Sequence, residues 1–315
     1  MTAIDTSLLV ASGALGAVVG SFLNVVIYRL PRGEFLSRGR RSVCPGCGEK
    51  IASYHNIPIF GWLWLRGTAR CCGAPISVRY LMVEALTAGL FMLLWQWPPS
   101  GLAFPEEGAS ALFAFLLQAY FLANLVSCSF IDVDHRILPD RLTKSGMLVG
   151  CLGAFALPEA FGQFGIRGLS LHVDSALFSI TGLLVGFGVT QLVLWIGQRV
   201  FRKAAMGFGD VKFMAMMGAF LGWEDVLLTF FLGCVLGAIA GAVHRLRTGD
   251  AYIYFGPFLA MGGAISLFLG KDLKGLLVAY QDWQRTSPEA PWVTSVAAGV
   301  SLVLLIWLVR RGRAH

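Results

Sequence analysis

The chain has 315 residues, of which 56% are hydrophobic and only 14% are charged. A water-soluble globular domain of this length does not carry so large an apolar fraction, so the composition indicates an integral membrane protein. The net charge of +7 does not indicate a nucleic-acid partner, because the basic residues gather in certain loops and lack interleaved aromatic side chains for stacking on bases.

Nine apolar segments are predicted to cross a bilayer as helices, since one crossing needs roughly 17–25 mostly apolar residues. Two of them, near 143 and 211, are short, which is consistent with a tilted, interfacial or partly re-entrant course. The expected fold is an all-α polytopic membrane protein, a bundle of about eight to nine transmembrane helices. The predicted spans are 7–28, 80–98, 109–131, 143–158, 175–197, 211–223, 226–243, 255–270 and 293–309.

Three domains are expected along the chain. Residues 1–28 form the first transmembrane helix, which lacks a basic n-region and an Ala-x-Ala cleavage site and is therefore expected to stay as an anchor. Residues 29–79 form a polar insertion that is rich in Gly, Pro and Cys and too short for a large core. Residues 80–315 form the remaining polytopic membrane domain.

The positive charges predict the orientation of the bundle, because cytoplasmic loops of membrane proteins carry an excess of Lys and Arg. A non-cytoplasmic N-terminus followed by nine spans puts every basic cluster in the cytoplasm. The same assignment puts Asp132 and Asp210, which lie at the ends of two different spans, on the cytoplasmic face. The clusters lie within 29–79, 136–144, 199–212, 245–247 and 310–313.

The insertion contains four cysteines, in Cys44-Pro45-Gly46-Cys47 and in the adjacent pair Cys71-Cys72. A Cys-x-x-Cys loop followed about 25 residues later by a second cysteine pair resembles a zinc ribbon or knuckle, and a Zn²⁺ ion would hold together a module with little core. Adjacent cysteines are awkward ligands for one ion. A three-cysteine site completed by His55 or water, a disulfide and free thiols therefore stay open as alternatives.

The two aspartates Asp132 and Asp210 stand out because each lies beside an apolar run, where a carboxylate costs several kcal/mol unless a partner or water compensates. Taken singly, each has a structural interpretation, such as a helix cap or an ion pair; Asp140, after Pro139, is also interpreted as a helix N-cap. Taken together on one face, they predict a carboxylate pair that shares one proton, the arrangement that aspartic proteases use.

Asp210 closes the sequence Gly207-Phe208-Gly209-Asp210. The two glycines allow a close backbone approach, so an extended substrate strand can lie beside the carboxylate. If the carboxylate of Asp132 lies opposite, the ionised member of the pair activates water and the protonated member polarises a scissile carbonyl.

These motifs together resemble the type IV prepilin peptidases, bacterial inner-membrane aspartyl proteases of the Gly-x-Gly-Asp class. The matching residues extend over nearly the whole chain and are specific as a set. They are Gly20-Ser21-Phe22-Leu23-Asn24 through Pro31, Cys44-Pro45-Gly46-Cys47, Asn56-Ile57-Pro58, Leu65-Arg66-Gly67, Pro75 through Tyr80, Glu84, Ile131-Asp132-Val133-Asp134 through Asp140, and Met206-Gly207-Phe208-Gly209-Asp210-Val211-Lys212.

The resemblance implies cleavage of the basic leader of prepilins and pseudopilins after a glycine, at the cytoplasmic face of the bacterial inner membrane. It implies that Asp132 and Asp210 are catalytic and that Gly207, Gly209 and Lys212 support the catalytic loop. Family members with the insertion also methylate the new N-terminal amine, with S-adenosylmethionine as methyl donor. The partners expected are prepilins, pseudopilins and the lipid bilayer, and no nucleic acid.

The family's four-cysteine pattern falls on Cys44, Cys47, position 69 and Cys72, but position 69 is Ala69 in this chain and Cys71 lies beside Cys72. Two alternatives follow. One is a peptidase whose methylase function was lost with that substitution. The other, from a different class, is a transporter that binds protons or cations at Asp132 and Asp210.

The sequence contains no Gly-rich fingerprint for binding S-adenosylmethionine, so the spacing of motifs does not locate the methyl-donor site. Glu84, Asn24 and Arg79 are polar residues in or near spans and are candidates for it. Each also has a structural interpretation, for example a hydrogen bond inside the bundle for Asn24 and an interfacial anchor for Arg79.

Overall fold

A computed structural model describes residues 3–34, 44, 46–99, 109–201, 206–248, 254–287, 289, 291–292 and 294–295. The regular structure in these residues is helical, apart from an isolated bridge between Thr68 and Pro75. The elements are α1 (Ala3–Arg29), η1 (Ser53–Asn56), α2 (Phe60–Trp64), α3 (Val78–Gln96), α4 (Ala109–His135), α5 (Asp140–Ala156), η2 (Pro158–Ala160), α6 (Leu171–Phe201), α7 (Phe208–Thr248) and α8 (Gly256–Thr286).

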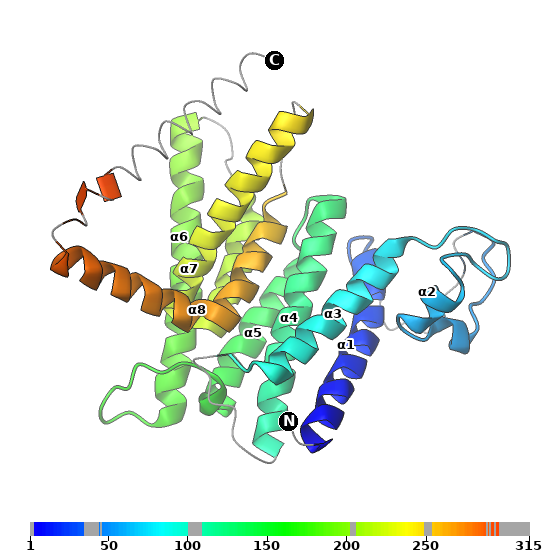
Figure 1. The fold of residues 1–315 in the computed structure, drawn as a ribbon, viewed down its shortest axis with the longest axis horizontal. Coiled ribbons are helices and arrows are strands. Elements are labelled where there is room, and N and C mark those ends of the chain that lie inside the picture. The colour runs from blue at the N-terminus through cyan, green and yellow to red at the C-terminus, as the bar shows by residue number, and fades with distance from the viewer. Residues whose placement is uncertain are drawn as a thin grey trace.

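Five of these helices, α1, α3, α4, α6 and α7, are long and apolar enough to cross a membrane. The predicted all-α polytopic fold is thereby confirmed. Figure 1 shows α6 at one edge of the bundle and α1 and α3 toward the other, with the insertion and its short helix α2 beyond them.

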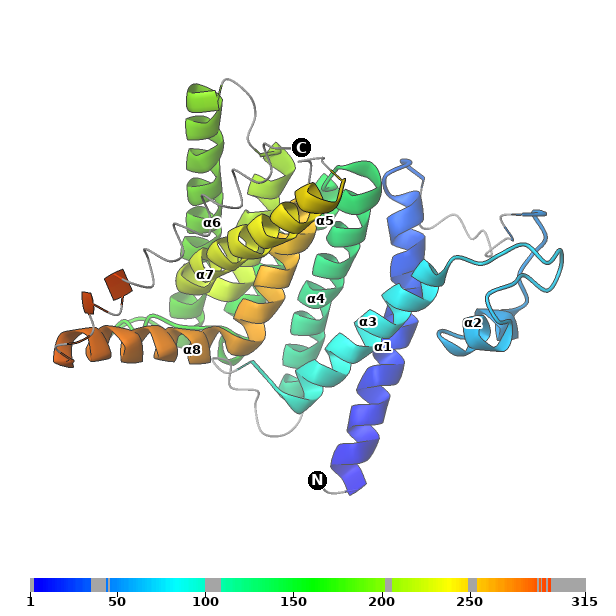
Figure 2. The same cartoon turned by 45° about the horizontal axis from the view of Figure 1, so that its top comes forward.

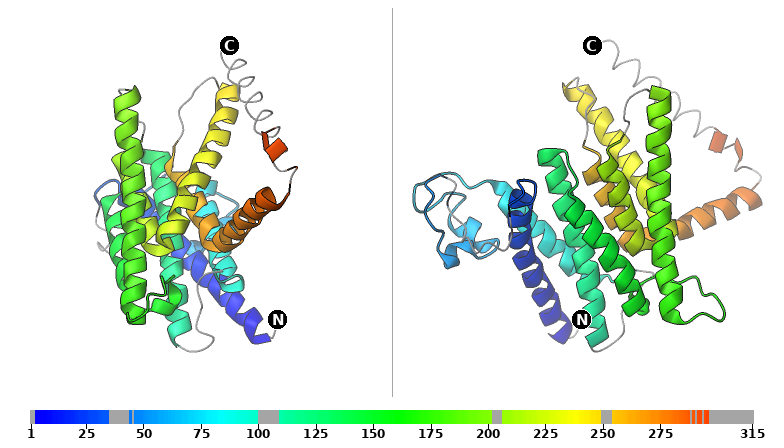
Figure 3. Two further views of the ribbon diagram at one scale, coloured as in Figure 1. Left: turned by 90° about the vertical axis from the view of Figure 1, so that its left-hand side faces the viewer. Right: turned by 180° about the vertical axis from the view of Figure 1, so that it is seen from behind.

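Helix α7 contains two of the predicted spans, 211–223 and 226–243, because it breaks at Gly222. Gly222 has φ = 81°, a left-handed conformation that glycine adopts without steric cost. The second half of α7 runs back toward the end at which the helix begins (Figures 1 and 3). This reversal explains why the first half is short for a crossing.

The predicted spans 143–158 and 255–270 correspond to α5 and to the first half of α8. The second half of α8 turns away from the bundle (Figure 2). The ninth predicted span, 293–309, lies almost entirely outside the described residues.

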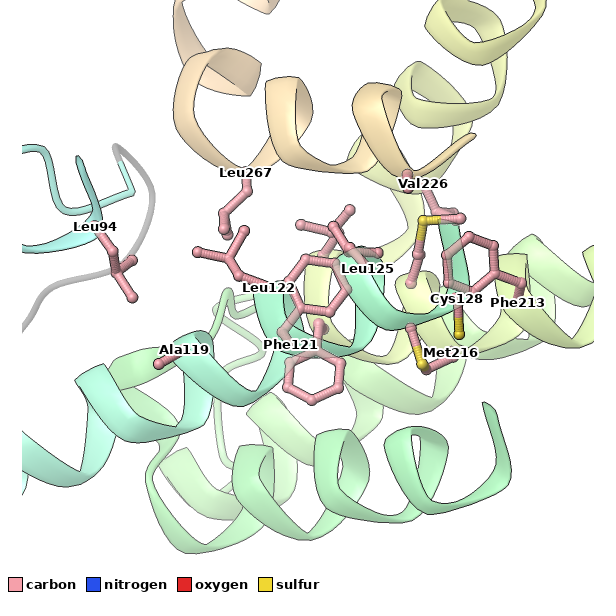
Figure 4. Packing of buried hydrophobic residues seen from close by; sticks show 14 of the residues in the cluster. Leu94, Ala119, Phe121, Leu122, Leu125, Cys128, Phe213, Met216, Val226 and Leu267 are labelled. Carbon is pink, nitrogen blue, oxygen red and sulfur yellow. The ribbon is translucent and has the colours of Figure 1, made fainter. Parts of the chain in front are cut away.

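Helix α4 lies at the centre of the core. Between residues 114 and 128 it is apolar on almost every face, as expected for a helix surrounded by others. Its side chains pack against α7 and α8 (Figure 4), with Phe121 stacked on Phe220 of α7, and Gln118 donates to the carbonyl of Ala160 in η2. Members of this core include Phe121, Leu122, Leu125, Cys128, Phe213, Met216 and Leu267. Cys128 is fully buried there, as expected of a thiol that behaves as a small hydrophobe.

Helices α6 and α7 approach so closely that their backbones touch. A Cβ added at Gly182 would overlap the carbonyl oxygen of Gly218, and the reverse holds for a Cβ at Gly218. Small residues allow such contact between helices in membranes, where packing replaces the hydrophobic effect as the main attraction. Glycine is therefore required at both positions for this helix spacing.

Gly182→Val is expected to lower the thermal unfolding midpoint, because overpacking costs about 1–3 kcal/mol even where side chains can give way. Gly188→Val is the matched control, since a Cβ at Gly188 on the same helix meets nothing within 4 Å. Unfolding of both variants in detergent would measure the difference, and equal midpoints would contradict this packing account.

Candidate active site

Three helix ends meet at the predicted site: the last turn of α4 carries Asp132, the first turn of α7 carries Asp210, and α8 begins at Gly256. Helix α4 ends at His135, where Arg136 adopts a left-handed φ of 58°, and Pro139 follows before α5. The chain thus turns one helical turn after Asp132, whose side chain contacts the start of α8 and interacts electrostatically with Asp210 at the start of α7.

The carboxylate of Asp132 is buried, with only 9% of the residue exposed. Its Oδ2 accepts a hydrogen bond of 3.0 Å from the backbone N–H of Gly256, the first residue of α8. A helix N-terminus offers unpaired N–H groups and the positive end of its dipole, so it compensates part of the cost of burying a carboxylate. A Cβ at Gly256 would lie 2.6 Å from Oδ2, which leaves room only for glycine.

Sequence reasoning missed Gly256. The signal was present in Phe255-Gly256-Pro257, because Pro is common in the first turn of a helix and so indicates the start of α8. That pattern does not indicate which side chain the helix start faces.

Asp210 is equally buried, with 9% of the residue exposed, and its side chain caps the N-terminus of α7. Its Oδ2 accepts from the N–H of Gly207 at 3.1 Å, while the N–H of Asp210 donates to the carbonyl of Gly207, also at 3.1 Å. This contact resembles half of a capping box. The cap interpretation of Asp210 is therefore correct. Only one of its carboxylate oxygens makes the cap, and the same carboxylate also interacts electrostatically with Asp132.

Gly209 lies against the segment between α4 and α5. A Cβ at Gly209 would lie 3.1 Å from the Cβ of Leu138, which is buried. The start of α7 and the segment that follows Asp132 are thus held in contact through a glycine and an apolar side chain.

The N-cap interpretation of Asp140 is wrong. Asp140 is the first residue of α5, the preceding Pro139 makes no side-chain cap, and the Asp140 carboxylate instead accepts from Lys212 at 2.6 Å and from Lys144 at 2.8 Å. Lys212 thereby ties the start of α7 to α5. The supporting role expected of Lys212 in the catalytic loop stays a prediction.

The four cysteines of the insertion lie together, with their Sγ atoms all within 4.8 Å of one another. Cys44 and Cys72 are 3.6 Å apart, and Cys47 and Cys71 are 3.3 Å apart. Tetrahedral Zn²⁺ with Zn–S bonds of about 2.3 Å places its sulfur ligands about 3.8 Å apart, so the cluster fits this ion. His55 does not belong to the cluster, and both adjacent cysteines do.

Two tight turns build the cluster. The N–H of Gly48 donates to the carbonyl of Cys44 at 2.8 Å, and the N–H of Gly73 donates to the carbonyl of Ala69 at 2.7 Å. Both glycines have positive φ, 75° and 70°. The second turn brings Cys71 and Cys72 to the same side, so Cys71 supplies the thiol that Ala69 lacks.

Backbone N–H groups of Gly46 and Cys47 donate to the Sγ of Cys44 and lower the pKa of its thiol to about 7. Hydrogen bonds with the neighbouring thiols, that of Cys47 first, raise the pKa of Cys71 to about 12. At neutral pH without a cation, Cys44 is therefore partly a thiolate, whereas Cys71 is a neutral thiol. A divalent cation would favour the remaining thiolates, as metal binding at cysteines requires.

Glu84 on α3 connects the insertion to the bundle. Its buried carboxylate accepts from the N–H of Ile59 at 2.7 Å, just before α2. Ile59 has φ = 65°, a conformation that a β-branched residue rarely adopts unless its surroundings hold it there. Asn24 similarly joins α1 to α3 by donating to the carbonyl of Tyr80 at 3.1 Å, which confirms the hydrogen bond expected of it inside the bundle.

The architecture and the carboxylate pair define a polytopic membrane protein with a buried acidic site where helix ends meet. Two family models match this chain: "Bacterial Peptidase A24 N-terminal domain" over residues 14–97 and "Type IV leader peptidase family" over residues 119–242. The chain belongs to the type IV leader peptidase family. Asp132 and Asp210 both fall within the second match.

Curated relatives agree with this assignment. A prepilin leader peptidase/N-methyltransferase of Myxococcus xanthus is 39% identical over 75% of this chain and 63% of that protein. Proteins of the same name from Pectobacterium carotovorum and Pseudomonas aeruginosa are each 34% identical, over 82% of this chain and 92% and 89% of their own lengths. No solved structure matches the chain.

Glu84→Leu is expected to speed proteolysis of segment 46–77, because an unpaired buried N–H costs about 1–3 kcal/mol and Ile59 would lose its acceptor. Glu84→Gln keeps a carbonyl oxygen at the same place and is the matched control. Limited trypsin digestion followed by mass spectrometry measures the rates, and equal rates in the two variants would show that this hydrogen bond does not anchor the insertion.

Proposed function

We propose that this protein cleaves the leader peptide from type IV prepilins and pseudopilins at the cytoplasmic face of the inner membrane, and then methylates the new N-terminus. The observation that carries the proposal is that Asp132, at the end of α4, and Asp210, at the start of α7, are both buried and close enough to interact electrostatically. The names of the relatives, prepilin leader peptidase/N-methyltransferase, support both activities.

In the proposed cleavage, one carboxylate of the pair is ionised and the other is protonated, since two like charges in one buried site disfavour double ionisation. The ionised carboxylate takes a proton from water as the water oxygen attacks the scissile carbonyl carbon, and the protonated carboxyl donates a hydrogen bond to the carbonyl oxygen. The C–N bond then breaks, and the leaving amine takes up a proton from the carboxyl pair, which thereby returns to its singly protonated state. Coupled carboxylates titrate as a pair, so neither is assigned as acid or base.

The backbone donors of Gly256 and Gly207 have a defined part in this reaction. Each donates to one oxygen of one aspartate and so fixes the direction of its carboxylate. Carboxylates whose directions are fixed before substrate binds need less rearrangement during the reaction, and such preorganisation lowers a barrier.

The position of the site suits a membrane-anchored substrate. A prepilin is expected to arrive as a membrane helix with its basic leader in the cytoplasm. Asp132 and Asp210 lie at the ends of apolar helices rather than in the middle of a span. They can therefore reach the scissile bond of the prepilin at the membrane edge, and the substrate does not have to move across the bilayer. The basic residues near this end, Lys144 and Lys212 among them, support its cytoplasmic orientation.

The proposed methylation uses the amine that cleavage releases, whose ordinary pKa is about 7.7–8.0, so a substantial fraction is neutral at physiological pH. The neutral nitrogen attacks the methyl carbon of S-adenosylmethionine, the carbon–sulfur bond breaks with its electron pair left on sulfur, and the methylated nitrogen loses a proton to water. The intact cysteine cluster favours retention of this activity over the peptidase-only alternative, because Cys71 compensates for Ala69. The transporter alternative has no support among the relatives.

Asp132→Asn and Asp210→Asn are each expected to reduce leader cleavage by about 10²–10⁴-fold or more, the usual contribution of general acid–base groups. Asp282→Asn, an exposed residue on the second half of α8, is the matched control and should cleave normally. Gel or mass-spectrometric assay of a purified prepilin measures the rates, and full activity in either site variant would remove the mechanism.

We also propose that the cysteine cluster binds one structural Zn²⁺, with Cys44, Cys47, Cys71 and Cys72 as ligands. Elemental analysis is expected to find about one zinc per chain, as for a four-cysteine site. Cys44→Ser and Cys72→Ser should lose the metal, whereas Cys151→Ser, outside the cluster, should keep it. Absence of zinc from the purified wild-type protein would contradict the assignment.

A further inference from the structure

A cavity of about 380 Å³ lies between the ends of α1, α3 and α4, apart from the carboxylate pair. Ligand sites for small molecules commonly have volumes of about 300–1,000 Å³ and occur where domains meet. This cavity lies where the two matched family segments meet, since α1 and α3 fall in 14–97 and the end of α4 falls in 119–242. Its lining includes Asn24, Tyr28, Arg32, Arg79, Tyr80 and Asp134.

The cavity and the carboxylate pair share the last turn of α4. Asp134 follows Asp132 by two residues, and at 3.6 residues per turn two residues differ by about 200° around the helix. Asp132 accordingly contacts the start of α8, while Asp134 pairs with Arg79 on α3. A helix with its side chains is about 10–12 Å across, so an amine released beside Asp132 needs to pass around only one helix end to reach the cavity.

The groups in the cavity carry both signs of charge next to aromatic rings. Arg79 pairs with Asp134 and donates to the carbonyl of Phe130 at 3.3 Å. The guanidinium of Arg32 stacks 4.0 Å above the centre of the Tyr28 ring. A small ligand with a carboxylate, a cationic group and a flat ring would find a partner for each of these parts.

We propose that this cavity is the binding site for S-adenosylmethionine, an inference that rests on the proposed methyltransferase activity. Arg79 and Arg32 suit the ligand's carboxylate, since guanidinium groups form charge-assisted hydrogen bonds with carboxylates. Asp134 suits its ammonium group or ribose hydroxyls. The rings of Tyr28 and Tyr80 suit the sulfonium and adenine, because aromatic faces attract cations and stack on bases.

The charge balance distinguishes this ligand from a lipid phosphate. A phosphate would also be attracted by Arg32 and Arg79, but the carboxylate of Asp134 would repel it. The amino-acid end of S-adenosylmethionine is zwitterionic and so matches the ion pair of Arg79 with Asp134. When the ligand binds, Arg79 can pair with its carboxylate and Asp134 with its ammonium group instead of with each other.

The test measures binding of tritiated S-adenosylmethionine to the full-length protein in nanodiscs of neutral lipid. Asp134→Asn and Tyr28→Leu are each expected to weaken binding about tenfold or more, because the first removes a charged hydrogen-bond partner and the second removes an aromatic face. Tyr28 is 53% exposed, so its replacement is a second variant that leaves the helix packing intact. Thermal unfolding midpoints check that both variants are folded.

Glu224→Gln is the matched control, because it removes a carboxylate from another ion pair, that with Lys274, which joins α7 just after its break at Gly222 to the interior of α8. It should bind the methyl donor and cleave leader peptide as the wild type does. Photolabelling of the wild-type protein with 8-azido-S-adenosylmethionine should mark peptides within 24–32 or 77–80. This result does not depend on whether the variants fold.

The outcomes separate the inference from the function on which it rests. Labelling confined to the cysteine insertion, or unchanged binding in folded Asp134→Asn and Tyr28→Leu, overturns the cavity assignment while methylation stands. Failure of the wild type both to bind the donor and to methylate processed pilin overturns the methyltransferase proposal itself. Displacement of the label by anionic lipid but not by S-adenosylhomocysteine assigns the cavity to a lipid headgroup and also overturns the inference.

Discussion

The hydrogen bond from the N–H of Gly256 to the carboxylate of Asp132 is the contact on which the rest of this arrangement depends. A buried carboxylate is costly at the edge of an apolar bundle, and the start of α8 compensates that cost with a backbone donor and a helix dipole. Asp210 is compensated in a similar way, by the N–H of Gly207 at the start of its own helix. Both acids are thus held by hydrogen bonds from backbone N–H groups.

The glycines of the bundle bring these helix starts together. Gly256 allows α8 to begin against Asp132, Gly209 allows α7 to begin against Leu138, and Gly222 reverses α7 so that its second half returns toward the site. Helix α4 lies among them with a core that is apolar on nearly all faces. Its last turn carries two aspartates on opposite faces: Asp132 belongs to the proposed cleavage site, and Asp134 lines the proposed methyl-donor cavity.

Much of the fold was predictable from the sequence, because apolar length alone identifies helices that cross a bilayer. The split of α7 was also predictable, since Glu224 and Asp225 interrupt the apolar run beside Gly222. The distribution of basic loops predicted only that Asp132 and Asp210 lie on the same face of the bundle, and their close approach was a separate hypothesis. The catalytic roles of Asp132 and Asp210, the boundaries of the three domains and the zinc ligands stay predictions.

What sequence reasoning missed depends on contacts between distant segments. Asp140 was interpreted as a cap because its partner Lys212 lies 72 residues away. Gly256 lies 124 residues from Asp132, so nothing local indicates the hydrogen bond between them. The adjacent Cys71 and Cys72 looked unsuitable as joint ligands because the turn at Gly73, which brings both to one side, is a property of the folded backbone.

The most direct test of the central claim is an experimental structure of the protein in nanodiscs with a peptide analogue that carries a hydroxyl group in place of the scissile carbonyl. Such an analogue resembles the transition state and should bind more tightly than substrate. The account predicts that the hydroxyl oxygen lies about 2.6–3.2 Å from a carboxylate oxygen of both Asp132 and Asp210. A bound analogue that contacts only one of them, or neither, would contradict it.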